Sequence, residues 1–73
     1  MSILCYYDTK KNRRKEFVRL QIKREGTLYI FAELECKEFS GQVASGEIDR
    51  QEYDCEKDAR VAYKTRIGEL MMP

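Results

Sequence analysis

The 73-residue chain contains no histidine and no tryptophan, and only one proline. Without histidine, neither a Cys–His nor a Ser–His catalytic pair can form, and no side chain titrates near neutral pH in its unperturbed state. The four glycines are isolated, so the chain has no glycine-rich loop of the kind that cradles phosphate groups. We therefore predict a protein that is not an enzyme, with no catalytic residue and no cofactor.

Cysteine is scarce and unpaired in the sequence. Cys5, Cys36 and Cys55 form no CxxC pair, and without histidine a structural zinc site would need a carboxylate ligand, so we predict no metal site. An odd number of cysteines, and a start without a basic segment followed by a long apolar one, predict a reduced, cytoplasmic setting. The apolar run 28–32 has five residues, far fewer than the roughly 20 of a membrane span, so we expect no membrane contact.

Alternating apolar and polar residues predict a small antiparallel sheet. Residues 3–7 predict a first strand, and the polar stretch 8–15 predicts a loop. Strict alternation over 17–23 and again over 28–37 is the period of a half-buried strand. Turn signals at 40–41 and 45–46 predict a fourth strand that is bent or interrupted near Gly46. A chain of this length forms a single domain, residues 1–73.

The loop between the second and third strands decides which side chains share a face. A two-residue loop at Glu25-Gly26 would mix the apolar and polar faces, whereas a three-residue loop, 24–26, pairs Ile22 with Leu28. It would also place Gly26 where positive φ is needed. We therefore predict the three-residue loop and one apolar stripe across both strands. The stripe consists of Val18, Leu20, Ile22, Leu28, Ile30, Ala32 and Leu34.

The C-terminal segment predicts an amphipathic helix with Asp54 as its N-cap. At the helical period one face collects Cys55, Ala59, Ala62, Tyr63, Ile67 and Leu70. We expect this face to pack on the apolar stripe, with Leu20, Ile30 and Ile67 almost fully buried. Cys36 and Cys55 are then interpreted as core thiols. The predicted fold class is α+β, a small antiparallel β-sheet of about four strands covered on one face by a single C-terminal helix (ββββα).

Charge is distributed unevenly along the chain. Residues 1–27 hold eight basic and three acidic side chains, a net charge of +5, while residues 28–73 hold six and ten, a net charge of −4. Five cations gather in six residues of the predicted loop: Lys10, Lys11, Arg13, Arg14 and Lys15. They could neutralise phosphates, the first requirement for binding nucleic acid, or form a solvated loop between strands.

The face opposite the helix is the second candidate surface, because one helix cannot cover both faces. The predicted partner-binding residues on it are Phe17, Arg19, Lys23, Tyr29 and Phe31. Aromatic side chains beside Arg and Lys are typical of base-stacking platforms and equally of protein interfaces. Glu33 and Glu35 on the same predicted face would repel phosphates, which favours a protein partner. In the alternative, the first or fourth strand folds over this face and buries its aromatic residues.

The order of features resembles the WGR domain, a sheet-plus-helix module of DNA-repair polymerases and stand-alone bacterial proteins. The matching residues are Tyr7-Asp8, Asn12, Lys15, Phe17, Val18-Arg19-Leu20-Gln21, Gly41-Gln42-Val43, Tyr53-Asp54, Ala59 and Tyr63. The Trp-Gly-Arg that names the family is absent, and Leu34-Glu35-Cys36 stands roughly in its place, so DNA-end recognition does not carry over with the resemblance. The element order alone is also similar to the dimeric single-strand-binding fold of transcriptional coactivators.

These features predict a small protein-interaction module, of the kind a phage or mobile element encodes as an inhibitor or adaptor that occludes a partner's surface. The partner would be a host protein or a second copy of the chain in a homodimer. The alternative is a nucleic-acid-binding module, WGR-like or of single-strand-binding type. It would use the basic loop together with the aromatic and basic face of the sheet.

Overall fold

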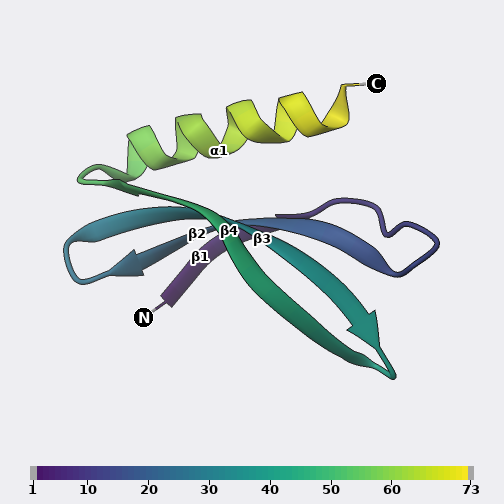
Figure 1. Ribbon diagram of the computed structural model, residues 1–73. Coiled ribbons are helices and arrows are strands. Elements are labelled where there is room, and N and C mark those ends of the chain that lie inside the picture. Colours follow the sequence, from purple (N-terminus) through teal and green to yellow (C-terminus); the bar gives the residue numbers. More distant parts are fainter. Residues whose placement is uncertain (1, 73) are drawn as a thin grey trace.

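The computed structural model describes residues 2–72 and shows a sheet with a single helix lying along one face (Figure 1). The elements are β1 (Ser2–Asp8), β2 (Glu16–Glu25), β3 (Leu28–Phe39), β4 (Gln42–Tyr53) and α1 (Glu56–Met71). All strand pairs are antiparallel, and the strand order in the sheet is the order in the chain. The predicted ββββα arrangement is confirmed. Within residues 2–72 no helix is long and apolar enough to cross a membrane.

A two-residue turn, Gly26-Thr27, joins β2 to β3, so the predicted three-residue loop is wrong. Glu25 pairs with Leu28 across this turn, and Gly26 has φ of 63°. A glycine with positive φ at the first central position fits the type II′ turn, whose twist matches that of the flanking strands. Farther along the hairpin, Ile22 pairs with Phe31.

The shorter turn moves every β3 side chain to the face opposite the predicted one. Phe31 lies with Leu20 and Ile22 on the helix side, whereas Ile30 and Ala32 lie on the open face. Ile30 is 1% exposed, so its predicted burial is confirmed, but its predicted place beneath the helix is wrong.

The core between sheet and helix consists of Leu20, Ile22, Phe31, Ala59 and Tyr63. The rings of Phe31 and Tyr63 meet edge to face, with centroids 6.2 Å apart and planes at 90°, a favoured aromatic geometry. Ala59 is completely buried, as the predicted helical face requires. Ile67 packs against this core but is only half-buried, so its predicted full burial is wrong.

The helix begins one residue later than the sequence predicted. Cys55 is the N-cap, it makes no side-chain capping bond, and its carbonyl accepts the backbone N–H of Ala59 at 3.3 Å. Asp54 is therefore not the cap. Cys55 is exposed and Cys36 is buried, so the core-thiol interpretation is confirmed for Cys36 alone.

Long charged side chains cover part of the open face. Ile30 and Ala32 are buried there although α1 lies on the other side of the sheet. Arg50 of β4 reaches across β3 to Glu25 of β2, with Nη2 3.7 Å from Oε2. Because the aliphatic part of such a side chain can shield an apolar surface, this bridge helps to account for the burial beneath it.

The β3–β4 hairpin extends away from the helix (Figure 1). Its turn, Ser40-Gly41, has positive φ at both residues, 49° and 81°, as a type I′ turn requires. The register shifts where Glu33 pairs with Asp49 and the next β3 residue pairs with Glu47, which leaves Ile48 as the extra residue of a bulge. β4 is thus continuous rather than interrupted, and the irregularity predicted near Gly46 is the bulge at Ile48, two residues farther along the strand.

The β3 register gives a direct test with two phenylalanines of one strand. Phe31→Ala should lower the free energy of unfolding by about 3–5 kcal/mol, a large part of the stability of so small a domain, because Phe31 fills the core. Phe39→Ala should change it by less than about 1 kcal/mol, since Phe39 is 55% exposed. Urea unfolding measures both values. Similar losses at the two positions would contradict the register.

Candidate functional site

The β1–β2 loop, residues 9–15, is fixed by one asparagine. Asn12 Oδ1 accepts backbone N–H groups from Arg14 and Glu16, each at 2.9 Å, and its Nδ2 donates to Glu16 Oε1 at 3.1 Å. Lys15 has positive φ, 64°, and its carbonyl accepts the backbone N–H of Glu38 at 3.0 Å. The loop is therefore a defined structure held against β3, in which Asn12 makes the local bonds that asparagine favours in turns.

Four of the five predicted loop cations make no ion pair within residues 2–72. Lys11 is the exception, because it pairs with Glu38 and its Nζ lies 5.6 Å from the centre of the Phe17 ring. The remaining cations are exposed, and they are Lys10, Arg13, Arg14 and Lys15. The structure thus brings the basic residues together on an ordered loop with most of their charge available to an anion.

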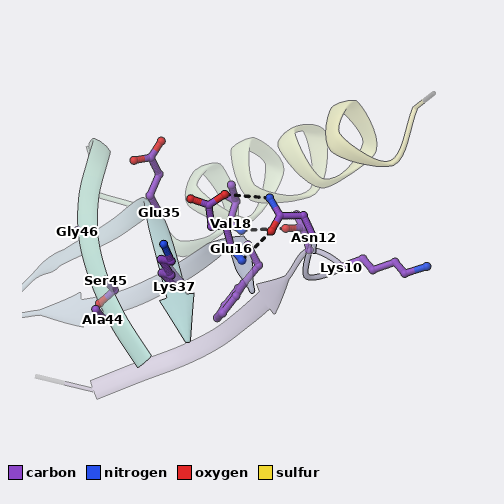
Figure 2. Close-up of a pocket in the computed structure, with 12 residues that line it drawn as sticks. Lys10, Asn12, Glu16, Val18, Glu35, Lys37, Ala44, Ser45 and Gly46 are labelled. Carbon is purple, nitrogen blue, oxygen red and sulfur yellow. Dashed lines mark hydrogen bonds between the residues drawn. The ribbon is translucent and has the colours of Figure 1, made fainter. Parts of the chain in front are cut away.

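A surface groove of about 640 Å³ lies between this loop and three strand segments: the start of β2, the second half of β3 and the first half of β4 (Figure 2). Its rim carries two lysines, Lys10 and Lys37, and two carboxylates, Glu16 and Glu35. Cys36 also lines it, but burial raises the pKa of this thiol, which keeps it protonated and unreactive. The mixed charge gives the groove no preference for anions over cations.

The predicted partner-binding cluster is divided between the two faces of the sheet. Tyr29 and Phe31 lie on the helix side, where Phe31 is 5% exposed, and only Phe17, Arg19 and Lys23 lie on the open face. The predicted five-residue cluster on an uncovered face is therefore wrong, and the one-residue change in the turn is the reason.

The same change moves the two glutamates of β3. Glu33 lies on the helix side, 9% exposed, and accepts two bonds from the Arg66 guanidinium, at 2.8 and 3.2 Å. Hydrogen bonding and the charge of Glu33 raise the pKa of Arg66. Glu35 follows on the same side by strand alternation. Neither carboxylate can repel a partner from the open face, contrary to the prediction.

Cationic and aromatic side chains alternate on the open face. Arg19 donates two bonds to Asp8, at 2.7 and 2.9 Å, and its guanidinium lies 5.0 Å from the centre of the Tyr6 ring and 5.8 Å from that of Phe17. Lys11 continues the series beyond Phe17. The hydrogen bonds to Asp8 raise the pKa of Arg19. Each contact is of the cation–π type, and the series ends at Tyr6, a residue that is 61% exposed.

A shallow groove of about 590 Å³ lies along β1 and the neighbouring part of β2. We call it the β1 surface; it is formed by Ile3, Leu4 and Tyr6 of β1 and by Arg19 and Gln21 of β2. Ile3, Leu4 and Tyr6 are exposed at 57%, 37% and 61%, and no residue from Ser2 to Tyr7 is charged. The register shift between Ile3 and Cys5 makes Leu4 the extra residue of a bulge. Sequence reasoning missed Tyr6, because its neighbours Arg19 and Asp8 come from pairing across strands.

The two edges of the sheet differ in charge. β1 and β4 each have one neighbouring strand, so each has one side of its backbone unpaired. Along β4 the edge carries Glu47, Asp49, Arg50 and Glu52, all exposed. Charged side chains on an edge strand oppose pairing with another chain, whereas an uncharged apolar edge invites it. β1 is therefore the more adhesive edge.

The open face as a whole is slightly acidic. By strand register it carries three cations, Arg19, Lys23 and Arg50, and five carboxylates, a net charge of −2 for these eight residues, or −1 when Lys11, which pairs with Glu38, is added. The carboxylates are Asp8, Glu25, Glu38, Glu47 and Glu52. Such a face offers phosphates little attraction apart from the neighbouring loop.

A small polar cluster joins β1 to the helix. Arg60 Nη1 lies 3.9 Å from Cys5 Sγ, to which it donates, and Arg60 Nε donates to Glu56 at 2.6 Å. Burial, and then the neighbouring Cys5 thiol, raise the pKa of Tyr63 to about 12. Within residues 2–72 no three cysteine or acidic side chains are grouped so as to hold a metal ion.

Comparison of the chain with models of protein families, with curated proteins and with solved structures gave no match. The resemblance to the WGR domain therefore stays a prediction.

The raised pKa of Tyr63 predicts a loss of stability in alkali. An ordinary tyrosine has a pKa near 10, so between about pH 10 and 12 the unfolded chain releases the Tyr63 proton while the folded chain retains it. The free energy of unfolding should then fall as pH rises, by up to about 1.4 kcal/mol per pH unit from this group. Tyr63→Phe should remove that contribution. Urea unfolding from pH 8 to 11.5 compares the two proteins, and parallel curves would contradict the assignment.

Proposed function

We propose that this chain is a small, non-enzymatic protein-interaction module that binds its partner through the β1 surface. The observation that carries the proposal is the uncharged edge strand with three exposed apolar or aromatic side chains, Ile3, Leu4 and Tyr6. An exposed edge of this composition can add a strand from another chain, with main-chain hydrogen bonds for affinity and side chains for specificity.

Backbone hydrogen bonding supports strand addition at β1. Thr9 donates its N–H to the carbonyl of Val18 at 2.9 Å. Because bonded and non-bonded pairs alternate in an antiparallel ladder, Tyr7 also bonds β2, and Tyr6 directs its N–H and C=O toward the free edge. An incoming strand therefore meets free backbone groups at Tyr6.

Tyr6 is also held in position before binding. Arg19 lies over its ring, and Asp8 fixes Arg19 by a bidentate ion pair. Aromatic and arginine side chains dominate the energy of protein interfaces, and a side chain that is already ordered loses less entropy on binding. On the open face Arg19 thus lies between the rings of Phe17 and Tyr6. Lys23 lies farther along β2, where it pairs with Ile3 near the start of β1.

Binding by strand addition would suit an inhibitor or adaptor. A partner that added a strand to β1 would have its own strand edge and the adjoining surface covered by the domain. Occlusion of this kind needs no chemistry from the bound domain. The slight net negative charge of the open face favours a protein over a nucleic acid as the occupant of this surface.

Substitution of one lysine on each edge tests the proposal. Leu4→Lys on β1 and Val43→Lys on β4 change exposed side chains, 37% and 48% accessible, and both variants should fold with unchanged stability. Tagged wild-type chain and Val43→Lys should capture the same protein from a nuclease-treated lysate that also contains untagged chain. Leu4→Lys should capture at least about tenfold less, because the lysine charge opposes pairing at the edge. Equal capture by all three proteins would refute binding at β1.

The second candidate function is nucleic-acid binding through the basic loop. The observation that favours it is the ordered arrangement of Lys10, Arg13, Arg14 and Lys15, none of which makes an ion pair within the described residues. Because Asn12 fixes the loop, these cations would contact phosphates without first having to order the backbone.

A salt titration tests this second candidate. The triple substitution Arg13→Ala, Arg14→Ala and Lys15→Ala should weaken binding to single- or double-stranded DNA. It should also reduce the slope of log affinity against log salt by about one unit per lost phosphate contact. Lys57→Ala with Lys64→Ala on the exposed side of α1 lowers net charge without altering the loop, and should leave the slope unchanged. No DNA or RNA binding at low salt by the wild-type chain would eliminate this candidate.

A further inference from the structure

We propose that the strand that adds to β1 is β1 of a second copy of this chain, so that two four-stranded sheets join across a twofold axis. This inference rests on the proposed function, because it names the partner of the same edge strand. In a twofold interface each residue on the axis meets its own counterpart, so the strand must be complementary to itself.

The charge distribution makes β1 self-complementary. Since no residue from Ser2 to Tyr7 is charged, antiparallel pairing of β1 with itself brings no like charges together along those residues. Asp8, at the end of the strand, is already neutralised by Arg19. β4 is the opposite case, because pairing with itself would crowd the carboxylates of Glu47, Asp49 and Glu52.

Backbone geometry selects the register of the two strands. The N–H and C=O of Tyr6 face the free edge, so a twofold axis at Tyr6 lets the two Tyr6 residues exchange both hydrogen bonds. Their rings then lie side by side on the open face, each with the Arg19 of its own copy over it. Cross-strand aromatic pairs of this kind stabilise antiparallel sheets. The pairing also covers Tyr6, which is 61% exposed in the single chain.

The β1–β2 ladder is regular from Cys5 to Asp8, and the bulge at Leu4 confines regular pairing with a second copy to the residues around Tyr6. The helix lies mainly over β2, β3 and the end of β4 (Figure 1), and its Arg60 reaches Cys5 of β1 on the face opposite Tyr6. The loop 9–15 leaves β1 at its far end and folds toward β3, where Lys15 bonds Glu38. Two copies can therefore pair along β1 with both helices on the same side of the joined sheet.

Opposite charges at Tyr6 test self-pairing specifically. Sedimentation velocity of the wild-type chain up to about 1 mM should show a dimer. Tyr6→Lys and Tyr6→Glu, each alone, should weaken dimerisation about tenfold, since each loses the aromatic pair and places like charges on the axis. An equimolar mixture of the two variants should recover the dimer, because lysine then faces glutamate. This recovery is the signature of position 6 meeting itself.

Val43→Lys on the other edge is the matched control and should dimerise like the wild-type chain. Circular dichroism of each variant checks that the exposed substitutions leave the fold intact. A monomeric wild-type chain at the highest concentration, or a mixture that stays monomeric, overturns the inference. The wild-type chain could be monomeric while the Leu4→Lys variant captures less of a lysate protein than the wild-type chain does. In that case the proposed function stands, with a different protein as the partner of β1. If the wild-type chain is monomeric and Leu4→Lys captures as much protein as the wild-type chain, the proposed function and the self-pairing inference are both refuted.

Discussion

The two-residue turn at Gly26-Thr27 determines which β3 side chains face the helix, and the core and both surfaces depend on that register. It pairs Ile22 with Phe31 and so brings a large ring beneath Tyr63. A slip by one residue would exchange Phe31 for Ile30 and Ala32 on the helix side, and a phenylalanine would replace them on the open face. Gly26 permits the tight turn because positive φ costs glycine almost nothing.

Element order and the helical face could be read from the sequence, because the alternation of β2 and the spacing of Ala59 and Tyr63 each match one period. The β3 register could not. Ile30, Phe31 and Ala32 are exposed by 1%, 5% and 0%, so this stretch is buried on both faces and its hydrophobicity does not distinguish them.

The candidate site was predictable to a similar extent. The basic loop is evident as a run of charge, and its position between the first two strands is confirmed. Its contacts are not evident, since Lys11 pairs with a glutamate 27 residues away. Tyr6 attracts no notice in the sequence because its role depends on Arg19, which only strand pairing brings beside it.

A domain with one helix must protect its second face by other means. Here Arg19 and Arg50 lie along the open face and end in ion pairs with Asp8 and Glu25. Ion pairs this exposed add little stability in themselves, but they hold the guanidinium of Arg19 beside Phe17 and extend the side chain of Arg50 across the open face of β3. The ion pairs therefore act mainly by keeping water from apolar residues that no helix covers.

Because each strand pairs with the one before it, the sheet can assemble in the order in which the ribosome releases the chain. The β1–β2 hairpin can close before β3 has emerged, and β3 then adds to an edge that already exists. Local contacts of this kind favour rapid folding. α1 follows all four strands in the chain and covers the core between helix and sheet, so the newly made sheet exposes Leu20, Ile22 and Phe31 until the helix has emerged. That interval is when the nascent chain is most vulnerable to aggregation and most in need of a chaperone.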